Sequence, residues 1–174
     1  MSAQFRLLGL DGDSCANDLL GLYMQDRRPA GWNAWAEVVG REPRVIRFLG
    51  DLPHAWVASD YIRAALDLFA YEDKAAETLV LGAGMTGDWL SGQGVRIEGL
   101  RTPHGALNLA MAGSADRMTV TIGGDARPTG GFVLRWPFAG TPPATRINGR
   151  AAQWRDGALH LPATGQPQRI DIGR

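Results

Sequence analysis

Short apolar runs separated by glycine and proline dominate the chain from Thr78 onward, and they limit its possible folds more than any other feature. Most of the 23 Gly and 10 Pro residues fall in this part, so the apolar segments have strand length rather than helix length. Two of them, Leu107–Met111 and Met118–Ile122, alternate apolar and polar side chains, as strands with one buried face do. An antiparallel β-sandwich is therefore predicted for the second half of the chain.

The positions of glycine, proline and turn dipeptides also predict individual elements of the sandwich. A short helical turn is expected at Thr86–Ser91, and Gly113–Asp116 is expected to join two strands. Asn148–Gly149 and Asp156–Gly157 are strong hairpin dipeptides, so consecutive hairpins are expected at the end of the chain. The predicted strands are Thr78–Leu81, Val95–Leu100, Ala106–Met111, Met118–Ile122, Phe132–Trp136, Thr145–Ile147, Ala158–Leu161 and Arg169–Ile172.

Two amphipathic helices are predicted before the sandwich. The first begins at Asp13 or Ser14 and ends before Pro29, and the second has Asp51 as a possible cap, contains Pro53 and runs to about Tyr71. Together with the strands they predict an α+β chain, with a helical segment at residues 1–75 and the β-sandwich at residues 76–174. The apolar faces at helical spacing are Ala16, Leu19, Leu20 and Tyr23 in the first helix, and Ala58, Ile62, Ala65, Leu66 and Phe69 in the second.

The composition excludes several classes of function. Eighteen basic and eighteen acidic residues cancel without a run of like charge, so neither nucleic acid nor a membrane surface is an expected partner. The single cysteine excludes an internal disulfide, and the three scattered histidines show no zinc spacing, so neither a metal nor another cofactor is expected. The N-terminus is too polar for a signal peptide and no apolar run has the length of a membrane span, so a soluble chain without an export signal is expected.

The stretch from Pro29 to Asp60 is the part of the sequence richest in binding chemistry. A sugar site packs the C–H face of a pyranose on an indole ring, while carboxylates and imidazole bind the hydroxyl groups. The alternative is that the three tryptophans anchor a helical layer and that the glutamate is merely solvated. The candidate substrate-binding residues are Trp32, Trp35, Asp51, His54 and Trp56, with Glu37 as the candidate catalytic residue.

The order of these motifs resembles the C-terminal part of (α/α)6-barrel glycoside hydrolases of the inverting α-L-rhamnosidase type. In that family a Trp-Glu element near the end of the barrel precedes an Asn-His-Tyr element that opens the next helix. Trp35-Ala36-Glu37 stands where the first would be, with Ala36 inserted, and Pro53-His54-Ala55-Trp56 stands where the second would be, with Pro53 in place of Asn. The resemblance implies that Glu37 is the counterpart of the general base and that His54 is a sugar-binding neighbour.

The chain is too short for the whole catalytic domain that the resemblance implies. Twelve barrel helices of about 11 residues with loops of about 5 residues would take roughly 190 residues, whereas this chain has 174 in all. An inverting glycosidase also needs a second carboxyl group on the other side of the sugar, for which Glu42, Asp51 and Asp60 are the nearby candidates. The expected function is therefore that of a C-terminal fragment or subunit that acts on carbohydrate and is not catalytically complete alone.

Two other functions remain open at this point. The chain could be a non-catalytic carbohydrate-binding or structural β-sandwich module, with Trp89, Trp136 or Trp154 as its platform, or a small independent enzyme that uses Glu37. The apolar helix faces at residues 13–71 would have few neighbours in a fragment. A homo-oligomer or an upstream catalytic chain is therefore the expected protein partner.

Overall fold

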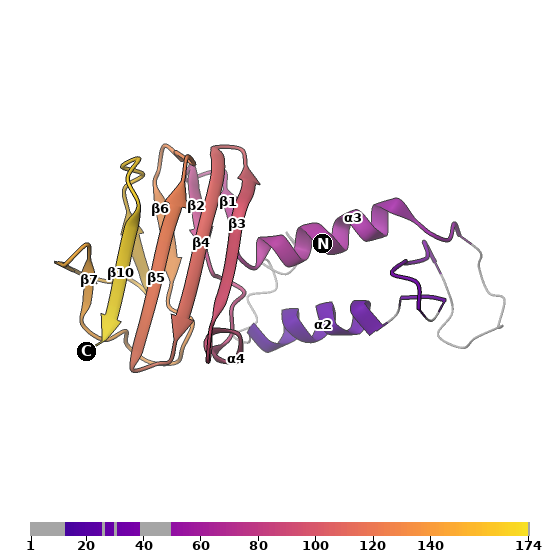
Figure 1. Cartoon of the computed structure of the whole chain (residues 1–174), viewed down its shortest axis with the longest axis horizontal. Helices are drawn as coiled ribbons and strands as arrows, with labels where there is room; N and C mark the ends of the chain where they lie inside the picture. The colour runs from indigo at the N-terminus through magenta and orange to yellow at the C-terminus, as the bar shows by residue number, and fades with distance from the viewer. Residues whose placement is uncertain (1–12, 26, 30, 39–49, 174) are drawn as a thin grey trace. The chain divides into compact units, whose positions relative to one another are not determined.

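The computed structural model describes residues 13–25, 27–29, 31–38 and 50–173 (Figure 1). The chain divides into two compact units between Asp67 and Leu68. The first unit contains helices α2 (Asp13–Gln25) and α3 (Ala55–Asp67), whereas the second contains the short helix α4 (Gly87–Leu90) and the strands. The α+β class predicted from the sequence is confirmed. None of the helices in the described ranges has the length and apolarity needed to cross a membrane.

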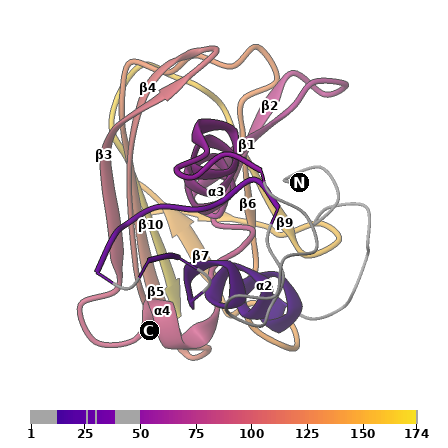
Figure 2. The same ribbon diagram turned by 90° about the vertical axis from the view of Figure 1, so that its right-hand side faces the viewer.

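The second unit is a sandwich of two sheets. The strand order is β1-β2-β6-β9 in one sheet and β3-β4-β5-β10-β7-β8 in the other, and the two layers separate clearly in Figure 2. Neighbouring strands of the described sheets are antiparallel except β2 and β6, which are parallel. The connection from β2 to β6 passes through β3, β4 and β5 of the other sheet, so β6 can run in the same direction as β2. The bounds are β1 Ala70–Asp73, β2 Thr78–Leu81, β3 Val95–Thr102, β4 Gly105–Gly113, β5 Arg117–Gly124, β6 Phe132–Arg135, β7 Thr145–Ile147, β8 Arg150–Ala152, β9 Ala158–Leu161 and β10 Gln168–Gly173.

The sandwich buries a layer of apolar side chains between its two sheets. The alternation predicted for β4 and β5 is confirmed, because Leu107, Leu109 and Met111 are buried while Asn108 is exposed, and β5 buries every second residue in the same way. The predicted turn at Gly113–Asp116 joins these two strands. The largest of its almost completely buried side chains are Leu79, Leu81, Met85, Leu90, Leu107, Leu109, Met111, Met118, Leu134, Leu159, Ile170 and Ile172.

Strand β1 differs from the sequence-based prediction, which continued the second helix to about Tyr71. The helix ends at Asp67, and β1 pairs with β2 so that Tyr71 lies opposite Val80. The Asp73 carboxylate accepts hydrogen bonds from the backbone amides of Ala75 and Ala76 in the turn between the two strands. Pairing with a buried neighbour strand therefore overrides the helical periodicity at this point. Residues 70–73, which the sequence-based division places with 1–75, thus belong to a sheet.

The end of the chain forms one hairpin rather than consecutive hairpins. Asn148 and Gly149 both have positive φ and join β7 to β8, a short exposed strand that the sequence analysis missed. Asp156 and Gly157 make a similar turn, but it closes only an isolated bridge, and β9 pairs with β6 in the other sheet. A turn dipeptide determines the local backbone, whereas the partner of the following strand depends on where its apolar face can be buried.

Both predicted helices are present, but α3 begins later and buries a different face. The first α-helical hydrogen bond runs from the Ala58 amide to the His54 carbonyl, so Asp51 does not cap the helix and Pro53 lies before it. Ile62, placed on the apolar face from the sequence, is 56% exposed, whereas Ala64 is buried. In α2 the side chains of the two predicted caps and of Ala16 lie outside the described residues.

Two glycines that precede β3 provide a test of the sandwich. Both have positive φ, but a Cβ on Gly94 would lie 2.1 Å from the Met111 carbonyl oxygen, whereas a Cβ on Gly92 would meet nothing within 4 Å. We expect Gly94→Ala to lower the free energy of unfolding by about 3 kcal/mol and the matched Gly92→Ala by about 1 kcal/mol. Urea unfolding followed by circular dichroism measures both, and equal losses would contradict the register of β3 and β4.

Candidate functional site

The candidate residues of the first unit are brought together by two backbone segments that pair side by side. The Glu37 amide donates to the Asp51 carbonyl at 3.0 Å, and the His54 amide donates to the Trp35 carbonyl at 2.7 Å. The Asp51 amide in turn donates to a carboxylate oxygen of Glu37 at 3.4 Å. Glu37 therefore lies beside Asp51 and His54, although these residues come from separate loops.

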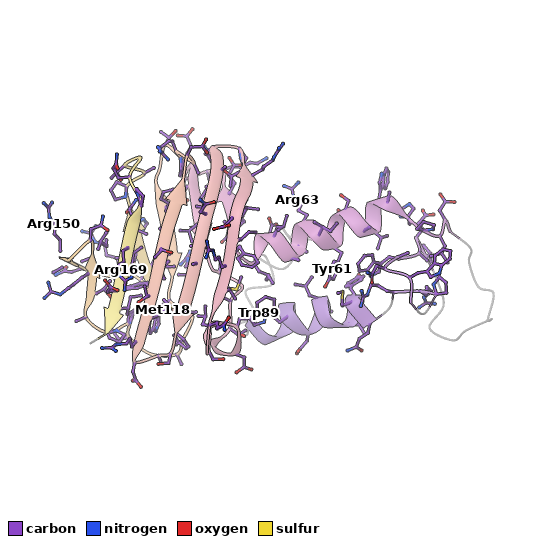
Figure 3. All side chains as sticks on the ribbon, viewed as in Figure 1. Tyr61, Arg63, Trp89, Met118, Arg150 and Arg169 are labelled. Carbon is purple, nitrogen blue, oxygen red and sulfur yellow. The ribbon has the colours of Figure 1, made fainter. Side chains whose placement is uncertain are left out.

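Trp35 anchors this arrangement. Its side chain is only 8% exposed, and its indole N–H donates to the Tyr23 carbonyl at 2.7 Å. The ring stacks on Tyr61 with 4.7 Å between centroids, and Tyr61 lies between α2 and α3 in Figure 3. Trp35 thus joins the two helices to the loop that carries Glu37, and it occupies the anchoring position that the sequence analysis left open as an alternative.

Glu37, Asp51 and His54 form a compact polar cluster, called the polar cluster below. One ligand-type atom from each residue lies within 4.8 Å of the other two. Both carboxylates are exposed and the imidazole is half-buried. Repulsion between two unit charges at such a separation is on the order of 1 kcal/mol in a water-like medium. Within the described ranges no lysine or arginine forms an ion pair with either carboxylate.

Two exposed tryptophans lie close to the polar cluster in the sequence. Trp56 is 79% exposed, and its ring centroid lies 6.0 Å from that of His54. Trp32 is 59% exposed and lies in the loop that leads to Trp35. An open indole face next to hydrogen-bonding groups can receive the C–H face of a sugar. Trp56 meets both requirements, because its imidazole neighbour belongs to the polar cluster.

The carboxyl spacing limits the chemistry of this site. Inverting glycosidases hold their two carboxyl groups about 6.5–9.5 Å apart, so that water fits beside the sugar. Oxygens of Glu37 and Asp51 approach within 4.8 Å, which leaves too little room for that arrangement. Of the other two acids considered, Asp60 is exposed on α3 and Glu42 lies outside the described residues. This approach suits binding of one ligand by Glu37 and Asp51 together better than work on opposite sides of a sugar.

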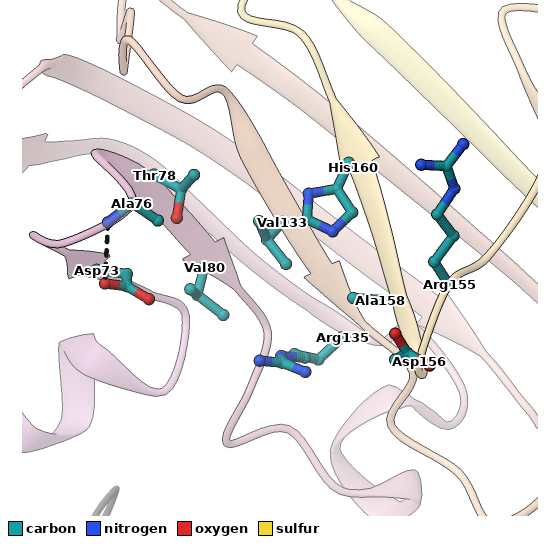
Figure 4. Close-up of a pocket in the computed structure, with 10 residues that line it drawn as sticks. All are labelled: Asp73, Ala76, Thr78, Val80, Val133, Arg135, Arg155, Asp156, Ala158 and His160. Atoms are coloured by element: carbon teal, nitrogen blue, oxygen red, sulfur yellow. Dashed lines mark hydrogen bonds between the residues drawn. The ribbon is translucent and has the colours of Figure 1, made fainter.

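A second polar pocket lies on the sandwich and was not found by the sequence analysis. The strand registers place Asp73, Val80, Val133, Arg135 and His160 on the face of the four-stranded sheet that points away from the other sheet. The alternation along β6 and β9 is the signal that could have located them. Figure 4 shows this cavity of about 340 Å³, lined by Asp73, Ala76, Thr78, Val80, Val133, Arg135, Arg155, Asp156, Ala158 and His160.

The sandwich tryptophans do not form an open platform together. Trp136 and Trp154 are half-buried and pack edge to face, with 5.7 Å between ring centroids. The Trp154 indole N–H donates to the Thr145 hydroxyl at 2.8 Å. Trp89 is 44% exposed on α4. Trp136 and Trp154 therefore serve the packing of the second unit, and only Trp89 offers an open ring among these three.

Comparison with known proteins finds no matching family model and no matching curated sequence. A family 31 glycoside hydrolase, a dextranase from Flavobacterium johnsoniae in complex with glucose, is similar over 56% of this chain and 16% of its own, with 12% identity and a TM-score of 0.38. A family 127 β-L-arabinofuranosidase from Geobacillus stearothermophilus T6 is similar over 67% of this chain and 18% of its own, with 9% identity and a TM-score of 0.42. This chain therefore spans less than a fifth of either protein. Both neighbours are glycoside hydrolases, and TM-scores this low do not place the chain in either family.

Proposed function

We propose that this chain is the C-terminal part of a glycoside-hydrolase-like protein and contacts carbohydrate through Trp56 and the polar cluster. The observation that carries the proposal is the 79% exposed Trp56 indole beside His54, whose imidazole lies within 4.8 Å of two carboxylates. The indole supplies an apolar face for a pyranose ring, and the polar cluster supplies donors and acceptors for its hydroxyl groups. The resemblance to inverting α-L-rhamnosidases supports rhamnose as the first sugar to test.

The proposal gives Trp35 a different role from Trp32 and Trp56. Because its indole is buried against Tyr61 and donates to Tyr23, Trp35 holds the loop that presents Glu37. Trp32 and Trp56 are the exposed rings available to a ligand. Glu37 remains the proposed counterpart of the general base, and its acid partner would have to come from an upstream chain or segment.

Carbohydrate binding is tested by titration with methyl α-L-rhamnopyranoside. We expect a dissociation constant in the millimolar range, because an exposed indole and three polar groups leave most of the sugar in water. Trp56→Ala should weaken binding by at least about tenfold, which corresponds to about 1.4 kcal/mol. Saturation-transfer NMR measures both constants.

Trp89→Ala is the matched control, since it removes the exposed indole of the other unit. Loss of binding in Trp89→Ala or Arg135→Ala, with Trp56→Ala unaffected, would contradict the proposal. That outcome would favour the alternative function, a carbohydrate-binding β-sandwich module, which the cavity on the four-stranded sheet supports.

The chain alone should not hydrolyse para-nitrophenyl α-L-rhamnopyranoside. The Glu37 and Asp51 oxygens lie within 4.8 Å, closer than the spacing that inversion requires. Release of nitrophenolate is measured for the wild-type chain and for Glu37→Gln, which removes the charge at nearly constant volume. Turnover that Glu37→Gln abolishes would instead establish a small independent enzyme.

We further propose that a second copy of this chain or an upstream catalytic chain covers the first unit. Within the described ranges, seven of the eight large exposed apolar side chains lie between residues 22 and 62, and Trp89 is the eighth. Association would remove this apolar surface from water at about 25 cal/mol per Å². Trp32 and Trp56 are the rings proposed for the ligand, so the partner would cover the other five, which are Leu22, Met24, Val38, Leu52 and Ile62.

Light scattering at high micromolar concentration tests the assembly. We expect a dimer or larger oligomer that Ile62→Asp dissociates, because a buried unpaired carboxylate opposes association. Gln153→Asp adds the same charge at an exposed position of the second unit and should leave the mass unchanged. A monomeric wild-type chain would rule out the homo-oligomer and leave the upstream chain as the proposed partner.

A further inference from the structure

We propose that Glu37, Asp51 and His54 bind a divalent transition-metal ion, and that Zn²⁺ fits these donors best. This inference goes beyond the proposed carbohydrate function and does not require that a sugar binds. It starts from the three-way approach of the polar cluster, in which two carboxylate oxygens and one imidazole nitrogen all lie within 4.8 Å of one another.

The separations are close to those of a metal site. With bonds of about 2.0–2.1 Å, two ligand atoms of a tetrahedral zinc ion lie about 3.3 Å apart. Each pair in the polar cluster therefore has to close by at most about 1.5 Å. Both carboxylates are exposed, so side-chain rotation alone can supply this movement.

The backbone holds the three ligands in place before any ion arrives. The hydrogen bonds from Glu37 to Asp51 and from His54 to Trp35 join the two loops on either side of the polar cluster. Trp35, buried between Tyr23 and Tyr61, fixes the same loop to both helices. A site on a supported backbone loses less conformational entropy when the ion binds.

The hydrogen bonding of the imidazole adds to the argument from distance. Neither ring nitrogen of His54 has a hydrogen-bond partner in the described part of the chain, and its Nδ1 is shielded from solvent. A neutral imidazole bound to a metal through one nitrogen satisfies that nitrogen with a strong ligand bond. The cation would also offset the repulsion between two carboxylates that no described lysine or arginine neutralises.

The donor set selects the class of ion. Imidazole suits zinc and other transition metals, whereas calcium and magnesium prefer sites made of oxygen alone. Three protein ligands leave one position of a tetrahedral ion open. If the proposed carbohydrate function also holds, a hydroxyl group of a sugar on Trp56 could take that position.

The test is calorimetric titration of Zn²⁺ into the full chain after treatment with a chelator and without sugar. We expect one site with a dissociation constant in the micromolar range, and a loss of at least tenfold in Glu37→Gln and in His54→Ala. Asp60→Asn is the matched control, because Asp60 is an exposed carboxylate of α3 outside the polar cluster, and it should bind like the wild type. Glu37→Gln changes an exposed side chain at nearly constant volume, so it remains informative if His54→Ala disturbs the loop.

A second readout locates the ion. Paramagnetic Mn²⁺ should broaden the indole N–H signal of Trp56, whose ring lies 6.0 Å from that of His54, and Glu37→Gln should abolish this broadening. Trp56→Phe identifies the signal. Absence of binding up to millimolar Zn²⁺, or binding that neither Glu37→Gln nor His54→Ala weakens, would overturn the inference. Because no sugar is present, that result would leave the carbohydrate proposal standing, and sugar titration in excess chelator tests the latter separately.

Discussion

Burial of one aliphatic face from each sheet is the interaction on which the strand-rich unit depends. Leu79, Leu134 and Leu159 of the smaller sheet and Leu109, Val120 and Ile170 of the larger one are almost completely shielded from water. Each such side chain contributes about 1.5–3 kcal/mol of burial. Side chains alternate between the two faces of a strand, so the residues next to these leucines lie on the opposite face of the smaller sheet. There Asp73, Arg135 and His160 line a cavity. The pocket on the sandwich is thus a consequence of how the core is packed.

The first unit depends on one aromatic side chain. Trp35 combines ring stacking on Tyr61 with a hydrogen bond to the Tyr23 carbonyl, and so connects α2, α3 and the loop between them. Two backbone hydrogen bonds join this loop to the segment that contains Asp51 and His54, and so position the polar cluster. The same geometry brings one carboxylate oxygen of Glu37 and one of Asp51 within 4.8 Å, close enough to share a ligand. Sugar hydroxyls and a metal ion are the two ligands proposed for the polar cluster.

The sequence-based predictions succeeded where one local pattern agreed with the tertiary packing. Alternation located β4 and β5, and Asn148–Gly149 located the hairpin of β7 and β8. They failed where a local pattern and the packing disagreed. The second helix was predicted to run to about Tyr71, but Ala70–Asp73 pairs with β2. Asp156–Gly157 is a hairpin dipeptide whose following strand joins the other sheet. Ile62 had the correct spacing for a buried face, yet Tyr61 is the residue of α3 that stacks on Trp35.

The sequence by itself determined the α+β class, the short helices and the strand-forming part of the chain, because these depend on the spacing of apolar residues and on the backbone preferences of glycine, proline and asparagine. It also offered Glu37, Asp51, His54 and Trp56 as candidate site residues, which stay predictions. Only the tertiary structure decided that the three polar residues meet and that Trp35 is buried while Trp56 is exposed. Residues far apart along a chain meet only after the backbone has paired and the core has formed. The spacing of residues along the sequence therefore does not determine the distance between their side chains in the folded chain.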